Sequence, residues 1–195
     1  MRSLIPVLAL AAACGSSNGT IKVSLTDAPT DLTNVSQVMI TYDELRVHDE
    51  ASDAEADAGT ADAAADGVDG KGWIVLCSEE RSFDLLGLTG GVFAPVCTQT
   101  LSDGGSDVAE ISVPAGRISQ LRLHVTSAKL VFNDGSPDVN LTVPSGAQSG
   151  LKINVDKDVP EGGTLDLKLD FDAGASLVKQ GNGTWKLQPV LKVMN

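Results

Sequence analysis

The sequence contains few aromatic side chains, few basic side chains and only two histidines. Four Phe, two Trp and one Tyr among 195 residues leave Val, Leu and Ile to fill the interior. The 14 Lys and Arg are outnumbered by 26 Asp and Glu, which gives a formal net charge of −12. This balance excludes a protein that binds nucleic acid by neutralising phosphates, because such proteins gain affinity from Lys and Arg that displace counterions. A catalytic triad or a zinc hydrolase site also lacks candidates, since His48 and His124 fall in separate segments.

The chain also lacks a hydrophobic run long enough to cross a membrane. The apolar run Leu4–Ala13 has ten residues, whereas a transmembrane helix needs about 20. A positively charged start, Met1–Ser3, precedes this run, and the small residues Ala11–Ala13 stand immediately before Cys14. This is the pattern of a secretory signal peptide, and we expect it to comprise residues 1–13.

The small side chains before Cys14 resemble the lipobox of bacterial lipoproteins, in which the thiol receives a diacylglyceryl group. Ala11 departs from that pattern, which usually has Leu at this position. The resemblance implies that Cys14 is lipidated and that residues 14–19, a polar stretch rich in Gly and Ser, tether a folded domain to a membrane. Because Gly15 and not Asp follows the cysteine, it also implies the outer membrane of the bacterial envelope, where the cell has one. The alternative is an ordinary secretory signal cleaved nearby, with Cys14 as an incidental thiol.

The other two cysteines, Cys77 and Cys97, form an even pair in a chain that we expect to be exported. Exported proteins reach compartments in which disulfides persist, so we expect a bond between these two residues. Closing a loop of this length stabilises a fold by about 3 kcal/mol in the chain-entropy model. The alternative is a pair of buried free thiols. A zinc site is disfavoured, because neither histidine has ligand spacing to either cysteine.

Beyond the tether, the dominant hydrophobic period is two, which is typical of half-buried strands. Alternating apolar residues occur in the ranges 21–25, 38–47, 73–75, 111–113, 121–132, 139–143, 151–155, 165–171 and 185–187. The phase slips at Asp43–Glu44, which predicts a β-bulge, and Leu85–Phe93 favours a short helix. Turns rich in Gly, Pro and Asn separate the strands. We expect residues 20–195 to form a single all-β domain, an antiparallel two-sheet β-sandwich of immunoglobulin-like or transthyretin-like type.

One segment, Asp49–Gly72, breaks the alternation. It carries eight of the 26 acidic residues among Ala and Gly, and Val68 is its only larger apolar side chain. Such a composition cannot bury enough surface to offset the entropy cost of ordering, so we expect a disordered, mobile acidic insertion between two strands. A solvated spacer is the simpler interpretation, and loose capture of divalent cations or of a basic partner is the alternative.

Six sequence blocks occur in an order that resembles a known lipoprotein domain. They are V-S-L-T-D-A-P (23–29), F-D-L-L-G-L (83–88), V-P-A-G-R-I-S-Q-L-R-L (113–123), L-T-V-P-S-G (141–146), L-D-F-D-A (169–173) and W-K-L-Q-P-V-L-K-V (185–193). From about Thr20 to Val193 the chain resembles the bacterial and archaeal family catalogued as domain of unknown function 4382. The resemblance implies a secreted or lipid-anchored, β-rich domain and assigns no activity.

Two groups of oxygen-bearing side chains are candidate calcium ligands. The first alternates as in the first half of a calcium loop, without the glycine and the bidentate Glu of such a loop, and consists of Asp134, Ser136, Asp138 and Asn140. The second places acidic residues at two strand ends and consists of Asp27, Asp170 and Asp172. The alternative for both groups is turn and edge chemistry, in which Asp and Asn cap backbone amides.

Together these features favour a non-catalytic, lipid-anchored domain of the cell envelope that presents a binding or structural surface. Its partners would be the membrane, reached through lipid on Cys14, and a protein or glycan that the sequence does not identify. A calcium-dependent adhesion or carbohydrate-binding module is the second hypothesis, and it alone requires a cofactor. An envelope hydrolase with an unrecognised site is the third.

Overall fold

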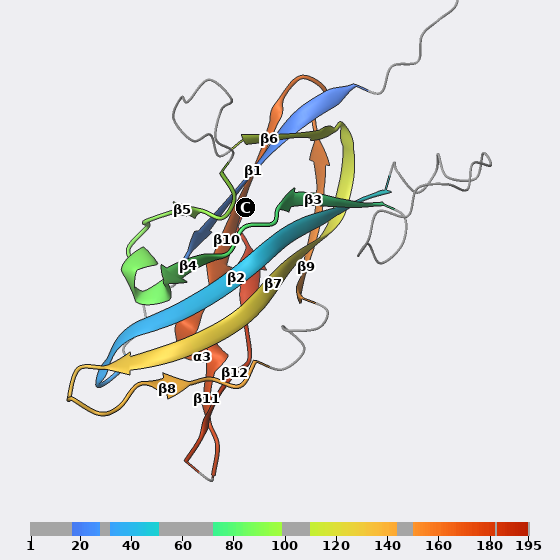
Figure 1. Ribbon diagram of the computed structural model, residues 1–195. Helices are drawn as coiled ribbons and strands as arrows, with labels where there is room; N and C mark the ends of the chain where they lie inside the picture. The colour runs from blue at the N-terminus through green and yellow to red at the C-terminus, as the bar shows by residue number, and fades with distance from the viewer. Residues whose placement is uncertain are drawn as a thin grey trace, which may run out of the picture.

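The computed structural model describes residues 17–27, 32–50, 72–98, 110–143, 150–181 and 183–194. These residues form a mostly β structure with two main sheets (Figure 1), so the expected β-rich fold is confirmed. Among them, no helix is both long and apolar enough to cross a membrane. The predicted signal peptide, Cys14 and the first half of the predicted tether fall within residues 1–16, which lie outside the described residues. Asn18 and Gly19, which we expected in the tether, instead belong to the first strand.

The first sheet has five strands and is built around β1 (Asn18–Thr26). On one side β1 pairs with β10 (Thr164–Phe171), which in turn pairs with β13 (Leu191–Val193). On the other side β1 pairs with β6 (Glu110–Pro114) and, further along its length, with β5 (Ala94–Pro95). The sheet therefore unites strands from both ends of the domain.

The pairing of β1 with β10 is parallel, which corrects the expectation of a purely antiparallel structure. The register is continuous from Thr20 opposite Thr164 to Thr26 opposite Asp170. Alternation with a period of two shows which face of a strand is buried, but it contains no information on strand direction. The parallel pairing matters for the site, because it brings the carboxyl ends of both strands to the same edge of the sheet.

The second sheet has six strands and is built on two long ones, β2 (Val35–Asp49) and β7 (Gly116–Phe132). These two strands pair antiparallel along their lengths and cross the front of the molecule in Figure 1. The shorter strands beside them are β3 (Trp73–Cys77), β4 (Arg81–Asp84), β8 (Val139–Asn140) and β9 (Leu151–Val159). The register of β2 against β7 shifts between Tyr42 and Glu44, so the predicted bulge is confirmed.

A two-stranded ribbon and one helical turn lie near the carboxyl end. The ribbon consists of β11 (Leu177–Lys179) and β12 (Trp185–Leu187). The helical turn, α3 (Ala173–Ser176), begins after Asp172, whose side chain accepts a hydrogen bond from Ala175 N. This cap satisfies an amide that has no partner within the turn.

A 3₁₀ helix, Leu85–Leu88, replaces the longer helix expected over residues 85–93. Its first turn is capped by Asp84, whose carboxylate accepts a hydrogen bond from Leu86 N. The helix ends early because Gly90 and Gly91 follow it with φ values of 76° and 87°, in the left-handed region that favours glycine. The chain turns there and runs back towards β5.

Both sheets contribute their inner faces to one hydrophobic core. Its members alternate along the strands as the sequence predicts, because every second residue of a strand points to the same face. From β1 and β10 they are Ile21, Val23, Leu25, Leu167, Leu169 and Phe171, and from β2 and β7 they include Val38, Ile40, Tyr42, Leu45, Val47, Leu121, Leu123 and Val125. Aliphatic residues supply most of this core, as the shortage of aromatic residues requires.

The acidic segment Asp49–Gly72 joins β2 to β3, and these two strands pair with each other. Asp49 N donates a hydrogen bond to Gly72 O at 2.8 Å, so the two ends of the segment meet. Residues 51–71 lie outside the described residues, and the expected disorder of the insertion stays a prediction.

Candidate functional site

A cavity of about 330 Å³ lies at the edge where the carboxyl ends of β1 and β10 meet. Its lining consists of Thr26, Asp27, Gly90, Gly91, Phe93, Asp170 and Met194. Sites for small molecules have volumes of about 300 to 1,000 Å³ and combine apolar walls with a few polar groups, as this cavity does. It is therefore the candidate binding site of the domain.

Hydrogen bonds fix the side of the cavity that belongs to β1. Thr26 Oγ1 donates to Leu88 O at 2.9 Å, and Asp27 N donates to the same carbonyl at 3.3 Å. The carboxylate of Asp27 is buried, and its Oδ1 accepts a hydrogen bond from Ala173 N at 2.8 Å. The end of β1 is thus attached both to the 3₁₀ helix and to the chain that follows β10.

Asp170 is the second carboxylate of the cavity and lies opposite Thr26 in the register. Among the described residues it forms no ion pair, and its enclosed Oδ1 atom accepts no hydrogen bond. Lys192 of β13 is its cross-strand neighbour and shares its face of the sheet, because directly opposite residues point the same way. A buried polar atom without a partner is uncommon in folded proteins, so Asp170 marks this cavity as a place where a donor would be favourable.

The opposite wall of the cavity is the segment after the 3₁₀ helix. The turn at Gly90 and Gly91 places Phe93 at the surface, where it remains 40% exposed. Phe93 also lines a neighbouring cavity of about 400 Å³, together with Lys22, Ser24, Pro95, Asp166 and Lys168. The ammonium nitrogen of Lys168 lies 5.5 Å from the centroid of the Phe93 ring, within the range of a cation–π contact.

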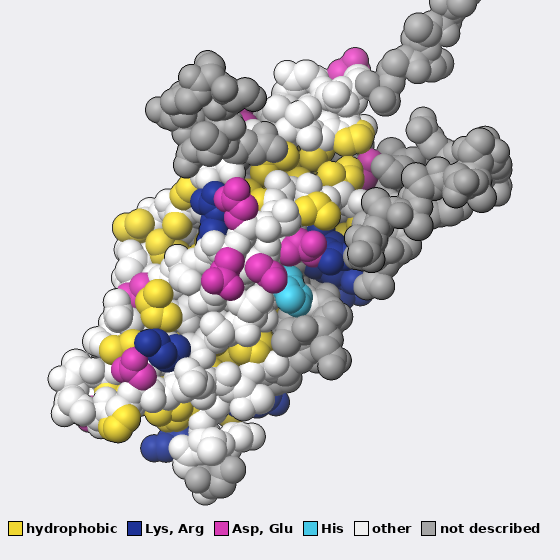
Figure 2. All heavy atoms as spheres, in the orientation of Figure 1, with side chains coloured by type: hydrophobic (Ala, Val, Ile, Leu, Met, Phe, Trp, Pro, Cys, Tyr) yellow, Lys and Arg dark blue, Asp and Glu magenta, His cyan; other side chains and the backbone are white. Residues whose placement is uncertain are grey.

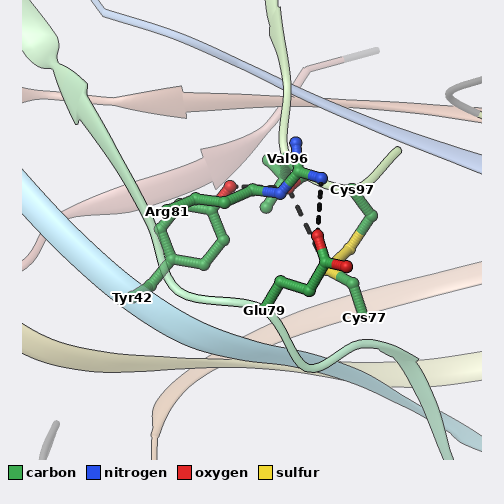
Figure 3. The surroundings of a disulfide bond; sticks show 6 residues. All are labelled: Tyr42, Cys77, Glu79, Arg81, Val96 and Cys97. Carbon is green, nitrogen blue, oxygen red and sulfur yellow. Dashed lines mark hydrogen bonds and ion pairs between the residues drawn. A yellow bond between two sulfur atoms is a disulfide. The ribbon is translucent and has the colours of Figure 1, made fainter. Parts of the chain in front are cut away.

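The predicted disulfide between Cys77 and Cys97 is confirmed (Figure 3). The two Cα atoms are 5.7 Å apart, within the usual range for a disulfide. Cys77 is the last residue of β3 in the second sheet, whereas Cys97 follows β5 of the first sheet. The bond therefore connects the two sheets and holds the segment that forms the wall of the cavity.

Tyr42 of β2 holds the same segment. Its hydroxyl donates a hydrogen bond to Val96 O, beside Cys97 (Figure 3). Burial raises the pKa of Tyr42 to about 12, against the opposing effect of the positive charge on Arg81. The chain that carries Phe93 is thus attached to the second sheet by one covalent bond and one buried hydrogen bond.

A known family matches the part of the chain that contains these features. The profile of the family described as Domain of unknown function (DUF4382) matches residues 18–189. The chain belongs to the DUF4382 family. The matched range includes both bonded cysteines and every residue that lines the first cavity except Met194. No curated protein and no solved structure matches the chain.

In this DUF4382 chain, the first group of predicted calcium ligands lies between the end of β7 and β8. Asp134 Oδ1 accepts a hydrogen bond from Ser136 N at 2.9 Å, and hydrogen bonding from Ser136 lowers the pKa of the Asp134 carboxyl group. Asp138 instead pairs with Lys129 Nζ at 2.8 Å, and Asn140 lies in β8 opposite Lys129. These side chains have protein partners in different directions, and a calcium role for the group stays a prediction.

The second predicted group is brought together in part. Asp27 and Asp170 line the same cavity, as the strand-end argument predicts. Asp172 instead caps α3, accepting a hydrogen bond from Ala175 N at 2.8 Å. Within the described part of the chain, no three or more His, Cys, Asp or Glu side chains are grouped so that they could hold a metal ion.

The outer face of the second sheet carries contacts that the sequence did not predict. His124 Nδ1 contacts Asp43 Oδ1 at the bulge of β2, and the Arg122 guanidinium lies 4.3 Å from the ring centroid of Trp73. Figure 2 shows acidic and basic side chains gathered around a histidine on this face. The register between neighbouring strands brings these residues together. The alternation of apolar and polar residues along a single strand therefore could not predict these contacts.

An enzyme-like pair also lies on the second sheet. Ser119 Oγ and His48 Nδ1 are 3.0 Å apart. A serine hydrolase additionally needs preorganised N–H donors around the reacting oxygen, within a site that binds substrate. Both residues belong to the paired strands β2 and β7, and neither of the two cavities described above is lined by them. The pair therefore does not favour the hydrolase hypothesis.

Proposed function

We propose that this chain is a non-catalytic, lipid-anchored binding domain of the bacterial cell envelope. The leader that resembles a lipoprotein signal, the position of Cys14 and the polar tether support the anchor. Two or more acyl chains on one residue give lasting membrane attachment, since each buried methylene contributes about 0.8 kcal/mol. Gly15 after the cysteine favours the outer membrane, where the cell has one.

The observation that carries the proposal is the course of β1. Its exposed amino end, Asn18, lies four residues after Cys14, whereas Thr26 and Asp27 at its other end line the cavity. Nine strand residues with a rise of about 3.3 Å each separate the two ends by roughly 27 Å. A lipid on Cys14 would therefore leave the cavity on the side that faces away from the membrane, where a ligand can reach it.

We also infer that the domain is a β-sandwich with a solvated acidic spacer. The shared core of the two sheets supports the sandwich, because each sheet then buries one face and leaves the other to water. The hydrogen bond between Asp49 and Gly72 supports the spacer, because it brings the two ends of the segment together at the strand pair β2–β3.

Metabolic labelling with radioactive palmitate tests the anchor. We expect label in the wild-type protein and none in the Cys14→Ser variant, because the diacylglyceryl group that carries the fatty acids is attached to the Cys14 sulfur. A variant with Cys77→Ser and Cys97→Ser is the matched control, since it loses two thiols but keeps the modified one. Label in Cys14→Ser, or loss of label in the control alone, contradicts lipidation at Cys14.

A further inference from the structure

We propose that the cavity between β1, β10 and Phe93 binds an organic ammonium group, such as the protonated amine of a small molecule. The inference rests on the proposed function, because it names the ligand class of that binding domain. Three observations support it: the negative charge of the cavity, the Asp170 oxygen that accepts no hydrogen bond within the described chain, and the apolar side chains that form the walls.

The charge of the cavity is negative. Asp27 and Asp170 contribute their carboxylates, and no Lys or Arg is among the described residues that line it. Asp27 has a structural role, since Ala173 N donates to it. Asp170 has no such role within the described chain, because its Oδ1 accepts no hydrogen bond and its carboxylate forms no ion pair. An ammonium group would supply both the positive charge and the donors that this carboxylate lacks.

The walls of the cavity suit the organic part of such a cation. Phe93 offers an aromatic ring and Met194 a thioether side chain, which is 44% exposed at the end of the described chain. An ammonium group is attracted to the face of an aromatic ring, and alkyl groups gain from contact with both side chains. The chain itself already shows that an ammonium can approach Phe93, since Lys168 Nζ lies 5.5 Å from its ring centroid.

A calcium ion fits the same cavity less well. Calcium takes six to eight oxygen ligands, whereas among the described residues that line the cavity the side-chain oxygens come from Thr26, Asp27 and Asp170. One Asp27 oxygen is already hydrogen-bonded, and Asp172 is directed to Ala175 N. The apolar walls would also displace water ligands that the ion needs.

The chain itself provides two competing cations, Lys168 beside Phe93 and Lys192 beside Asp170. Lys192 lies opposite Asp170 on the same face of the sheet, but it does not line the cavity and forms no ion pair among the described residues. Its positive charge should weaken the attraction of Asp170 for a second cation. Removal of this charge should therefore strengthen binding, which gives the proposal a gain-of-affinity test.

Methyl NMR of the full lipidated protein in detergent micelles can detect the binding. With ¹³C-methyl-labelled methionine, Met194 reports on the cavity and Met39 of β2 serves as an internal control. We expect n-butylammonium to shift the Met194 signal saturably and to leave Met39 unchanged. The neutral analogue 1-butanol should bind at least ten-fold more weakly, and calcium chloride at the same ionic strength should leave Met194 unchanged.

Four variants distinguish recognition by Asp170 from a general effect of net charge. Asp170→Asn should weaken n-butylammonium binding at least ten-fold, Phe93→Leu about three-fold, and Lys192→Gln should strengthen it about two-fold. Asp166→Asn is the matched control, because Asp166 lies on the same strand and face but lines the neighbouring cavity. It removes the same charge and should change the affinity less than two-fold.

Several outcomes would overturn the inference. Equal affinity for 1-butanol would show a merely apolar cavity, and a response to calcium alone would show a metal site. An equal loss in Asp166→Asn and Asp170→Asn would show that only net charge matters. If the palmitate label is present but Met194 does not respond to n-butylammonium, the ligand class is wrong while the anchored domain stands. If Met194 responds but the label is absent from the wild type, the anchor is wrong while the ligand class stands.

Discussion

The outer faces of the two sheets differ in how their charged side chains are satisfied. On the second sheet, Asp43 contacts His124 and Arg122 lies over the ring of Trp73, so charges on this face find partners within the protein. On the first sheet, Lys168 pairs with Asp166, but Asp170 has neither an ion pair nor a donor for its enclosed oxygen within the described chain. The difference lies in what the neighbouring strands place beside each charge.

This difference separates structural charges from those that are available to a ligand. A charge that meets its partner on a neighbouring strand contributes to the stability of the sheet. A carboxylate oxygen that is enclosed without a donor is unfavourable for the free protein, and a ligand that brings a donor removes this cost. The second sheet also holds the segment that forms one wall of the cavity, through the disulfide and Tyr42. The cavity on the first sheet therefore depends on bonds to the second sheet.

The largest expected effect comes from breaking the connection between the sheets. Replacement of Cys77 and Cys97 by Ser should lower the free energy of unfolding by about 3 kcal/mol, because the loop of 20 residues is no longer closed in the unfolded chain. Urea denaturation of the two proteins measures this difference. Cys14→Ser is the control and should leave the midpoint unchanged. A loss below about 1 kcal/mol would mean that the disulfide does little to hold the segment.

Tyr42 should make that connection sensitive to alkaline pH. Burial raises its pKa to about 12 from the ordinary value of 10.0, so between these values the unfolded chain releases the proton more readily. The free energy of unfolding should therefore be unaffected below pH 10 and fall by about 2 to 3 kcal/mol as the pH rises to 12.

Tyr42→Phe isolates this effect, because Tyr42 is the only tyrosine of the chain. The variant should lose one buried hydrogen bond at neutral pH. Its free energy of unfolding should not show the decrease above pH 10 that comes from ionisation of the tyrosine. Ultraviolet absorbance of tyrosinate during a pH titration measures the pKa directly. Ionisation near pH 10 in the folded protein would show that the hydroxyl is not held against Val96.

The smallest effect tests the contrast between the two faces directly. Asp43→Asn should lower stability by up to about 1 kcal/mol, because His124 loses a charged partner on a partly exposed face. Asp170→Asn should change stability by less than about 0.5 kcal/mol or raise it, because no partner is lost and an enclosed charge is removed. Thermal unfolding of both variants at the same pH provides the comparison. A greater loss in Asp170→Asn would mean that its carboxylate is structural.

Sequence analysis predicted features that residues close together in the sequence determine, and it also predicted the disulfide, because only two cysteines were left to pair. Alternation located the strands, and the phase slip at Asp43–Glu44 located the bulge, because both are local properties of a strand. The pairing of Cys77 with Cys97 followed from the compartment and from an even count. The expectation that acidic residues at two strand ends meet at the rim of the sandwich brought Asp27 and Asp170 together, although they meet at the ends of two strands of the same sheet.

The rest depended on contacts between distant segments. The parallel direction of β1 and β10, the position of Phe93 over their edge and the contact of His124 with Asp43 are all set by register and by the path of loops. Alternation is the same in parallel and antiparallel strands, so it could not reveal them. Asp172 was misplaced for a local reason, since α3 begins directly after β10 and takes this side chain as its cap.

The pairing of β1 with β10 also determines when the domain can fold. Thr20 and Thr164 contact each other although 144 positions separate them, so the high contact order of this strand pair makes its formation slow. A polypeptide that emerges amino end first cannot complete its first sheet until nearly all of it has been released. For the export that we propose, such a delay would keep the chain in a state that an export channel can thread, and closure of the fold would follow on the far side.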